Sequence, residues 1–240
     1  MTDVTPLVGL PPLPAPLAAA FAAGTAGGGK RERTQSALVR AAVQVFCARG
    51  VAAATVQEVA QVAGMTAATV YNHFPSKEAL VERVAMVLAQ TLCRVIGESQ
   101  AGVADAAERM AIGQRRYVWL AEVAPAWALL VLEIGTARPA LEEAIAAYPL
   151  ADLRLGVKQK RFKVPSEAVA LDAMQGICSS AMRRVALGQA PARHGIAVAT
   201  LVLRALGMAA DEAAEIARRP LPPFPEEAPP AQAARAKRAA

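Results

Sequence analysis

The sequence is poor in aromatic residues and in charge: aromatic side chains make up 4% of the 240 residues and charged ones 19%. Alanine supplies about a quarter of the chain, and alanine favours helices and disfavours strands. A β-sandwich or barrel would need regularly spaced strands of Val, Ile, Thr and Tyr between turn signals, and that pattern is missing. The composition therefore predicts an all-α protein whose helices pack closely through small side chains.

Cysteine and histidine are also scarce. Cysteine occurs only at Cys47, Cys93 and Cys178, and histidine only at His73 and His194. Three scattered cysteines fit a reduced cytoplasm better than a disulfide framework, and the two histidines leave too few ligands for a His/Cys metal site. The chain also lacks the GxSxG, HExxH, P-loop and Rossmann glycine motifs. We therefore expect neither an enzyme nor a bound metal or cofactor.

No membrane-spanning segment is predicted. The longest apolar candidate, Val118–Ile134, is interrupted by Glu122, Glu133 and Pro125, whereas a spanning helix needs about 20 mostly apolar residues. The net charge of +6 is compatible with nucleic-acid binding. Such a charge is also common among proteins that bind no nucleic acid, so it does not decide the function.

Both ends of the chain are expected to be disordered. Residues 1–29 are rich in proline and glycine, which predicts a flexible arm that holds no helix for long. Residues 220–240 carry repeated prolines and a basic tip, which predicts a tail. Leu17–Ala23 resembles the apolar core of a signal peptide, but no Lys or Arg precedes it.

The interval from residue 30 to residue 74 predicts three short helices with tight joints. The first closes at Gly50, which serves as a left-handed cap. Thr55 and Glu58 form the capping box of the second helix, and Gly64 ends it. Thr66 caps the third. The middle and last helices have the layout of a helix-turn-helix, in which the last one enters the major groove of DNA.

The remaining chain predicts further helices whose limits are set by prolines and caps. A long helix begins at Ser76 and runs to about Ile96, and another runs from Asp105 to Ala124 before Pro125 opens the next. Further boundaries are expected at Pro139, Pro149, Pro165 and Pro191, and the best-defined later helices are Ser166–Gly188, Arg193–Gly207 and Asp211–Arg219.

The stretch TVQEVAQVAGMTAATVYNHFPSKEALVERV, residues 55–84, resembles the DNA-binding domain of the TetR family of bacterial transcriptional regulators. The resemblance rests on Ala63-Gly64, Tyr71-Asn72-His73-Phe74 and Lys77-Glu78-Ala79-Leu80. It implies a helix-turn-helix domain over residues 30–80 and a larger helical domain for ligand binding and dimerisation over residues 81–219. The expected partners are double-stranded operator DNA, a second copy of the chain and an unknown small molecule, with no membrane.

The resemblance also implies roles for individual residues at the DNA. Thr55 would contact phosphate, Thr66, Ala67 and Thr69 would face base edges, and Tyr71, His73 and Lys77 would grip the backbone. Asn72 lies on the same outward face, and Arg33 precedes the first helix with other basic residues that could reach DNA. Ala67 is small, which leaves more of the specificity to DNA shape.

Two further sets of residues are candidates in the second domain. The expected dimer face lies on the last two long helices and comprises Met174, Ile177, Ala181, Val185, Val198, Leu201 and Val202. The alternative is that these residues form ordinary core within one chain. The expected ligand pocket has apolar walls and a few polar anchors, and its candidate residues are Met110, Tyr117, Trp119, Glu122, Trp127, Leu130 and Glu133. The alternative is that the tryptophans belong to the core and the glutamates face solvent.

The sequence thus predicts a sequence-specific DNA-binding regulator, a repressor that a small molecule releases from its operator. The alternative is a ligand-independent DNA-binding protein whose second domain is filled. A cavity in that domain distinguishes the two.

Overall fold

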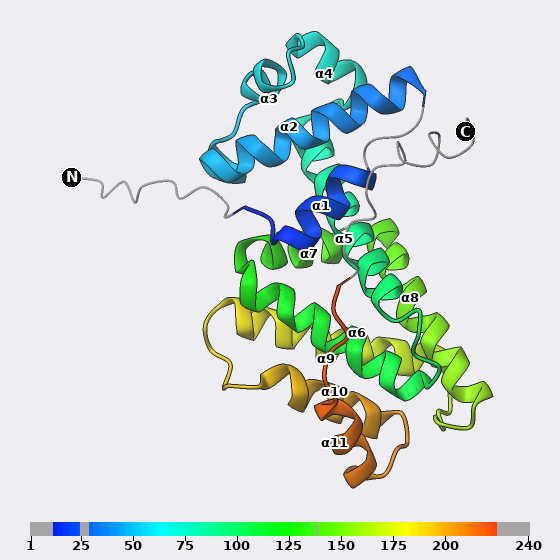
Figure 1. Ribbon diagram of the computed structural model, residues 1–240. Helices are drawn as coiled ribbons and strands as arrows, with labels where there is room; N and C mark the ends of the chain where they lie inside the picture. Colours follow the sequence, from blue (N-terminus) through cyan, green and yellow to red (C-terminus); the bar gives the residue numbers. More distant parts are fainter. Residues whose placement is uncertain (1–11, 25–28, 138, 225–240) are drawn as a thin grey trace, which may run out of the picture.

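The computed structural model describes residues 12–24, 29–137 and 139–224, and in this part of the chain every regular element is a helix. Figure 1 shows a small group formed by α2, α3 and α4 above a larger group formed by α6 to α11, with the long helix α5 running from one into the other. The helices are α1 (Ala15–Gly24), α2 (Lys30–Ala53), α3 (Val56–Val62), α4 (Ala67–His73), α5 (Lys77–Ser99), α6 (Ala106–Val123), α7 (Pro125–Ala137), α8 (Pro139–Lys158), α9 (Glu167–Ala186), α10 (His194–Ala205) and α11 (Ala210–Arg218). The all-α prediction is confirmed.

The predicted caps and turns of the small group are present. Thr55 Oγ1 accepts a hydrogen bond from the Glu58 amide at 3.2 Å, and Glu58 Oε2 accepts one from the Thr55 amide at 2.9 Å. Gly50 and Gly64 have φ of +75° and +66°, a region that favours glycine. The capping box and Gly64 set the limits of α3 because they satisfy backbone groups that helix ends leave unpaired. Gly50 was expected to close the first helix, but it lies inside α2, where its non-helical backbone marks a kink.

The segment predicted to be a disordered arm, residues 1–29, contains helix α1, so that prediction is wrong for this part. Leu17 and Phe21 are buried, and Arg94 of α5 donates a hydrogen bond to the Ala20 carbonyl at 2.9 Å. The prolines stand before the helix and in its first turn, where proline is tolerated. Most of the remaining residues of that segment lie outside the described part of the chain.

The start of the predicted tail also packs against the protein, which corrects the prediction for residues 220–224. Arg116 of α6 donates a hydrogen bond to the Pro222 carbonyl, and its guanidinium carbon lies 3.7 Å from the centre of the Phe224 ring. The Phe224 ring lies 5.0 Å from that of Trp119. In Figure 1 this segment runs from α11 back along α6. Residues 225–240 lie outside the described part.

Pro149 was expected to mark a boundary, but it lies inside α8. Proline removes one backbone hydrogen bond, and this loss is tolerated because α8 packs against α5, α6, α7 and α9. Tertiary contacts therefore override the local signal.

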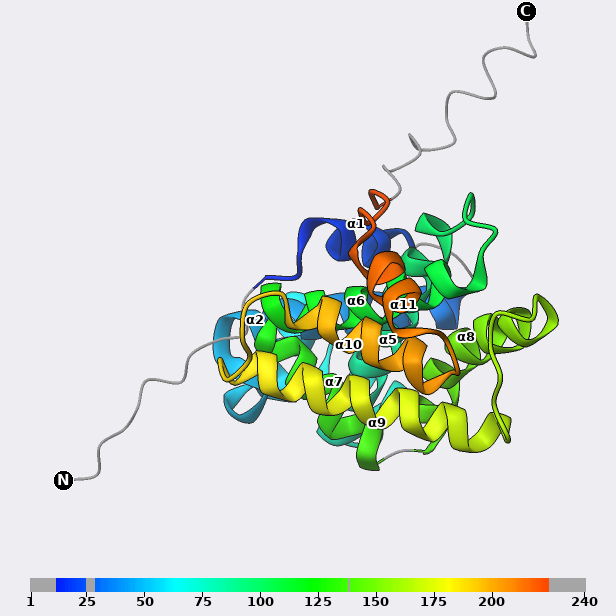
Figure 2. The same cartoon turned by 90° about the horizontal axis from the view of Figure 1, so that it is seen from below.

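The hydrophobic core is continuous from the small group into the upper part of the large one. Trp127 of α7 is fully buried and belongs to the same cluster as Leu38 of α2 and Leu88 of α5. A second cluster joins α6 with α8 to α11. Figure 2 shows these helices from below. By length and hydropathy alone α2 could cross a membrane, and the bent pair α6–α7 would count as a second such segment. Core helices often pass this test, and α2 buries Leu38 and Phe46 in the protein.

Candidate DNA-binding surface and ligand cavities

The helix-turn-helix is held by bonds across the tight turn between α3 and α4. The Met65 amide donates to the Ala60 carbonyl at 2.9 Å, and the Gly64 amide donates to the Gln61 carbonyl at 3.1 Å. Arg49 of α2 forms an ion pair with Glu58 of α3 at 3.0 Å, which fixes α3 against the first helix. Hydrogen bonds from the Thr55 amide and hydroxyl lower the pKa of Glu58, so the carboxylate stays ionised.

The outward face of α4 presents most of the side chains expected at DNA. Thr66, Tyr71 and Asn72 are exposed, with Tyr71 at 48%, and Ala67 and Thr69 are half-buried. The Thr66 hydroxyl accepts from the Thr69 amide at 3.2 Å and lies 3.0 Å from the Thr69 hydroxyl. The two hydroxyls are thus within hydrogen-bond distance of each other, and α4 begins directly after Thr66 because Thr66 caps its first turn. Thr55 and Arg33 are exposed on the same group of helices.

Two of the expected contact residues also have structural roles or constraints. Lys77 Nζ donates to the Ala52 carbonyl at 2.8 Å, which ties the first turn of α5 to the last turn of α2. An ammonium has three donors, so this bond leaves two for phosphate. The ring of His73 is half-buried, and its Nδ1 is buried without a partner among the described residues. The buried Nδ1 is therefore not available for a contact at the surface.

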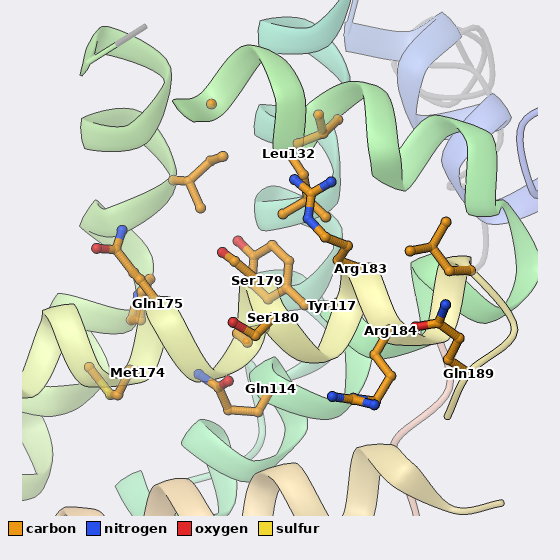
Figure 3. Close-up of a pocket in the computed structure, with 16 residues that line it drawn as sticks. Gln114, Tyr117, Leu132, Met174, Gln175, Ser179, Ser180, Arg183, Arg184 and Gln189 are labelled. Atoms are coloured by element: carbon orange, nitrogen blue, oxygen red, sulfur yellow. The ribbon is translucent and has the colours of Figure 1, made fainter. Parts of the chain in front are cut away.

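Two cavities lie side by side in the large group of helices. The first, about 470 Å³, lies between α6, α7, α8 and α9, and Figure 3 shows Tyr117, Gln114 and Arg183 among its walls. The second, about 430 Å³, lies between α5, α6 and α8 and includes Cys93 and Asp152. Both have Gln114, Tyr117 and Pro149 in their walls. Volumes of this size are typical of small-molecule sites.

The second cavity is polar at one end but carries no unbalanced charge among its described side chains. Arg109 Nε lies 2.6 Å from Asp152 Oδ1, and Arg109 also donates to the Gln100 carbonyl at 3.1 Å. Tyr117 Oη lies 2.8 Å from Cys93 Sγ. Burial raises the pKa of Cys93 to about 11 and the pKa of Tyr117 well above its usual value, so both groups are neutral near pH 7.

The comparisons with protein families cover both groups of helices. Residues 38–84 match the family described as bacterial regulatory proteins, tetR family, and residues 105–219 match the family described as tetracyclin repressor-like, C-terminal domain. The chain belongs to the TetR family. No curated protein sequence matches it.

Solved structures of TetR-family regulators have the same fold. The structure of RolR in complex with resorcinol is 27% identical, has a TM-score of 0.71 and covers 82% of this chain and 98% of that chain. RolR without ligand is 27% identical with a TM-score of 0.69 and covers 79% of this chain and 100% of that one. FadR from Bacillus subtilis in complex with stearoyl-CoA is 18% identical, has a TM-score of 0.55 and covers 71% of this chain and 96% of that chain, a likeness of fold alone.

In this TetR-family chain, only part of the expected ligand set lines the two cavities. Tyr117 lines both and Met110 lines the second. The other expected residues line neither: Trp127 and Leu130 are core, Glu122 and Glu133 are exposed, and Trp119 packs against Phe224. A helix turns about 100° per residue, so Trp119 lies almost opposite Tyr117 on α6. The alternative of core tryptophan and solvent-facing glutamate therefore applies here.

Most of the expected dimer residues are buried inside a single chain, which corrects their assignment. Met174, Ala181, Val198 and Val202 are 0–5% exposed, Ile177 and Val185 are half-buried, and Leu201 is 52% exposed. The reason is that α9 and α10 both pack on α6, so their most apolar faces turn inward. Of this set, only Leu201 is exposed at the surface.

Sequence reasoning missed several cavity residues, above all Gln114, Asp152 and Tyr148. A signal for Gln114 was present: Met110, Gln114 and Tyr117 follow the spacing i, i+4 and i+7, which places them on one face of a helix. A glutamine on the apolar face of α6 is unusual. The α8 residues gave no comparable signal, because their approach to α6 depends on tertiary packing.

Proposed function

We propose that the chain is a transcriptional repressor that binds operator DNA as a homodimer and is released by a small molecule in its second domain. The observation that carries the proposal is the pairing of an exposed helix-turn-helix face with two cavities of about 470 and 430 Å³. These cavities favour a ligand-responsive regulator over a ligand-independent one with a filled second domain. The reduced thiols and the DNA partner fit a cytoplasmic protein.

The DNA contacts are proposed for the exposed face of α4 and its neighbours. Thr66, Ala67 and Thr69 would read base edges, while Tyr71 and Lys77 would hold phosphates. Thr55, Asn72, His73 and Arg33 would complete the surface. Tyr71 and Asn72 are exposed in the free protein, so DNA can replace the water around them.

The route between ligand and DNA would run through α5. Cys93, Ile96 and Gly97 of α5 line the second cavity, and Lys77 at the other end of α5 bonds to the last turn of α2. A ligand that moves the lower end of α5 would therefore tilt the helix-turn-helix. Because paired recognition helices must sit about 34–36 Å apart, a small tilt in each subunit is enough to misfit the operator.

The dimer is proposed to form through the outward faces of α9 and α10. Gly176 and Ser180 of α9 are exposed, as are Leu187, directly after this helix, and Ala197 and Leu201 of α10. Ser180 and Leu187 also line the first cavity. Small side chains let helices approach closely, and Leu187 and Leu201 supply apolar area. Two such helix pairs can pack as a four-helix interface around a two-fold axis.

Selection of bound DNA from a random pool tests the DNA-binding function. We expect a palindromic sequence whose half-sites are spaced for a two-fold dimer. In the matched comparison, Tyr71→Ala should weaken operator binding by about tenfold through loss of a phosphate contact. Val157→Ala, which shortens a side chain of similar exposure on α8, should bind like the wild type. Failure to enrich any sequence, or equal effects of the two variants, would contradict the proposal.

Sedimentation tests the dimer. Leu201→Glu should convert the dimer to a monomer and abolish operator binding, because it places a charge in an apolar interface. Val157→Glu makes a similar change at an exposed position of α8 and should leave the dimer intact. A Leu201→Glu protein that remains dimeric would remove α10 from the interface.

A further inference from the structure

Gln114 is a buried polar side chain without a suitable partner. Its side chain is 5% exposed, and its Oε1 has no hydrogen-bond partner among the described residues. The amide nitrogen has only a weak contact, with Met110 Sδ at 4.0 Å. Leaving a buried acceptor unpaired destabilises a protein, so each case needs a physical reason.

The position of Gln114 supplies that reason, because the residue stands in the wall shared by the two cavities. Figure 3 shows it on α6 beneath α9, near Tyr117. A molecule in the second cavity would meet an acceptor at this point.

The other polar groups of the second cavity narrow the chemistry of that molecule. The charges of Arg109 and Asp152 are paired with each other, and Gln100 Nε2 already donates to the Arg109 carbonyl at 2.7 Å. The Gln114 oxygen is a buried acceptor in this wall that has no partner among the described residues. The cavity therefore calls for an uncharged molecule that brings its own hydrogen-bond donor.

The apolar walls favour a flat ring. Tyr117 and Tyr148 flank the cavity together with Met110, and thioether and aromatic groups pack well against an aromatic ring. Gly97 has no side chain, so the Tyr148 ring lies against α5, with only 3.8 Å between it and the place a Cβ would take. The volume of about 430 Å³ accommodates a one-ring or two-ring molecule.

We infer that the cavity between α5, α6 and α8 binds an uncharged hydroxylated aromatic molecule whose hydroxyl donates a hydrogen bond to Gln114 Oε1. This inference rests on the proposed function, for which it names the class of ligand. Gln114 is a binding residue whose oxygen stays unpaired until the ligand binds. Because the unpaired oxygen destabilises the free protein, a ligand that donates a hydrogen bond to it is favoured over one that does not.

Calorimetry with the full chain tests this inference, with phenol, catechol, resorcinol and hydroquinone as probes. At least one of these should bind and raise the melting temperature. Its fully methylated ether, which keeps the ring but loses every hydroxyl donor, should bind at least about tenfold more weakly. The charged 3-hydroxybenzoate should also bind more weakly, because the described side chains of this cavity include no unpaired cation. Binding of none of the four phenols, or equal binding of the ethers, would overturn the inference.

Two glutamine variants separate recognition from structure. Gln114→Leu should be at least as stable as the wild type without ligand, since it removes an unpaired buried polar group, and should bind the phenol about tenfold more weakly. Gln175→Leu, a change at a cavity residue absent from the second cavity, should bind it normally. A Gln114→Leu variant with unchanged phenol affinity, or with lowered stability, would refute the role of Gln114.

Operator binding without ligand distinguishes this failure from failure of the proposed function. If wild type and Gln114→Leu both bind the operator but no phenol binds, the regulator stands and the ligand class is wrong. If a phenol binds to the wild type but not to Gln114→Leu, and no operator can be selected, the ligand class is supported and the DNA-binding function is contradicted.

Discussion

Replacement of Gly156, near the end of α8, by alanine should destabilise the protein by a predictable amount. The chain turns back after α8 through Lys160, whose φ is +59°, and the Phe162 amide donates to the Gly156 carbonyl at 3.2 Å. The Phe162 ring, 2% exposed, then lies directly on the Gly156 backbone. A Cβ at this position would stand 2.0 Å from the nearest ring carbon.

The size of the effect follows from these contacts. Carbon atoms in contact are normally about 3.5–4.0 Å apart, so the ring must retreat in Gly156→Ala. Overpacking of this kind costs about 1–3 kcal/mol, and expulsion of the whole ring would cost about 3–5 kcal/mol. The better helix propensity of alanine returns about 1 kcal/mol. We therefore expect a net loss of about 2 kcal/mol, which for a chain of this size lowers the melting temperature by about 4–8 °C.

Thermal unfolding at fixed protein concentration measures this loss, because the stability of a dimer depends on concentration. Gly113→Ala is the matched control: it lies inside α6, and its nearest neighbour would be 3.9 Å away, an ordinary contact. It should be as stable as the wild type or slightly more so. The cost of Gly156→Ala should shrink when Phe162 is replaced by leucine. A Gly156→Ala protein that melts at or above the wild-type temperature would refute the reasoning.

Three further changes have defined outcomes. Thr55→Ala removes the capping box of α3 and should lower the free energy of unfolding in urea by about 1 kcal/mol; an unchanged value would mean that the cap contributes nothing. Phe224→Ala removes the ring that covers the buried Arg116 guanidinium and should cost about 1–2 kcal/mol, measured in the same way. Burial raises the pKa of Cys93 to about 11 and that of Cys178 to about 12, whereas the pKa of a thiol in the unfolded chain is about 8.5. The folded protein then holds more protons than the unfolded one above that pH, so stability should fall as pH rises from about 8.5 towards 11. Cys178→Ala should make that fall shallower, and an equally steep fall would assign it to other groups.

The features that could be predicted from the sequence are those that depend on residues close together in the chain. The capping box of Thr55, the turn at Gly64 and the caps at Thr66 and Ser76 are local devices, and the structure contains all of them. The resemblance in residues 55–84 likewise rests on consecutive residues and led to the correct family.

Features that depend on distant contacts were missed. Helix α1 exists because Leu17 and Phe21 find a buried site on the rest of the protein, and proline-rich composition alone says nothing of that site. Residues 220–224 are held by Arg116, more than a hundred positions earlier in the chain. The pocket was assigned from aromatic residues, yet Trp127 fills the core and the cavity is bounded by α5 and α8. Which face of a helix lines a cavity is decided by packing, and composition does not contain that information.

The place of Trp119 gives the protein a built-in optical probe. Its ring packs against that of Phe224 with the centroids 5.0 Å apart and the planes tilted by 51°, and it lies 5.8 Å from the Arg116 guanidinium. Trp119 is two residues along α6 from Tyr117. Trp127, by contrast, is fully enclosed. A shift of α6 relative to Phe224 would change the surroundings of Trp119. Intrinsic fluorescence of the unlabelled protein should therefore follow occupancy of the cavities directly, without dye or tag.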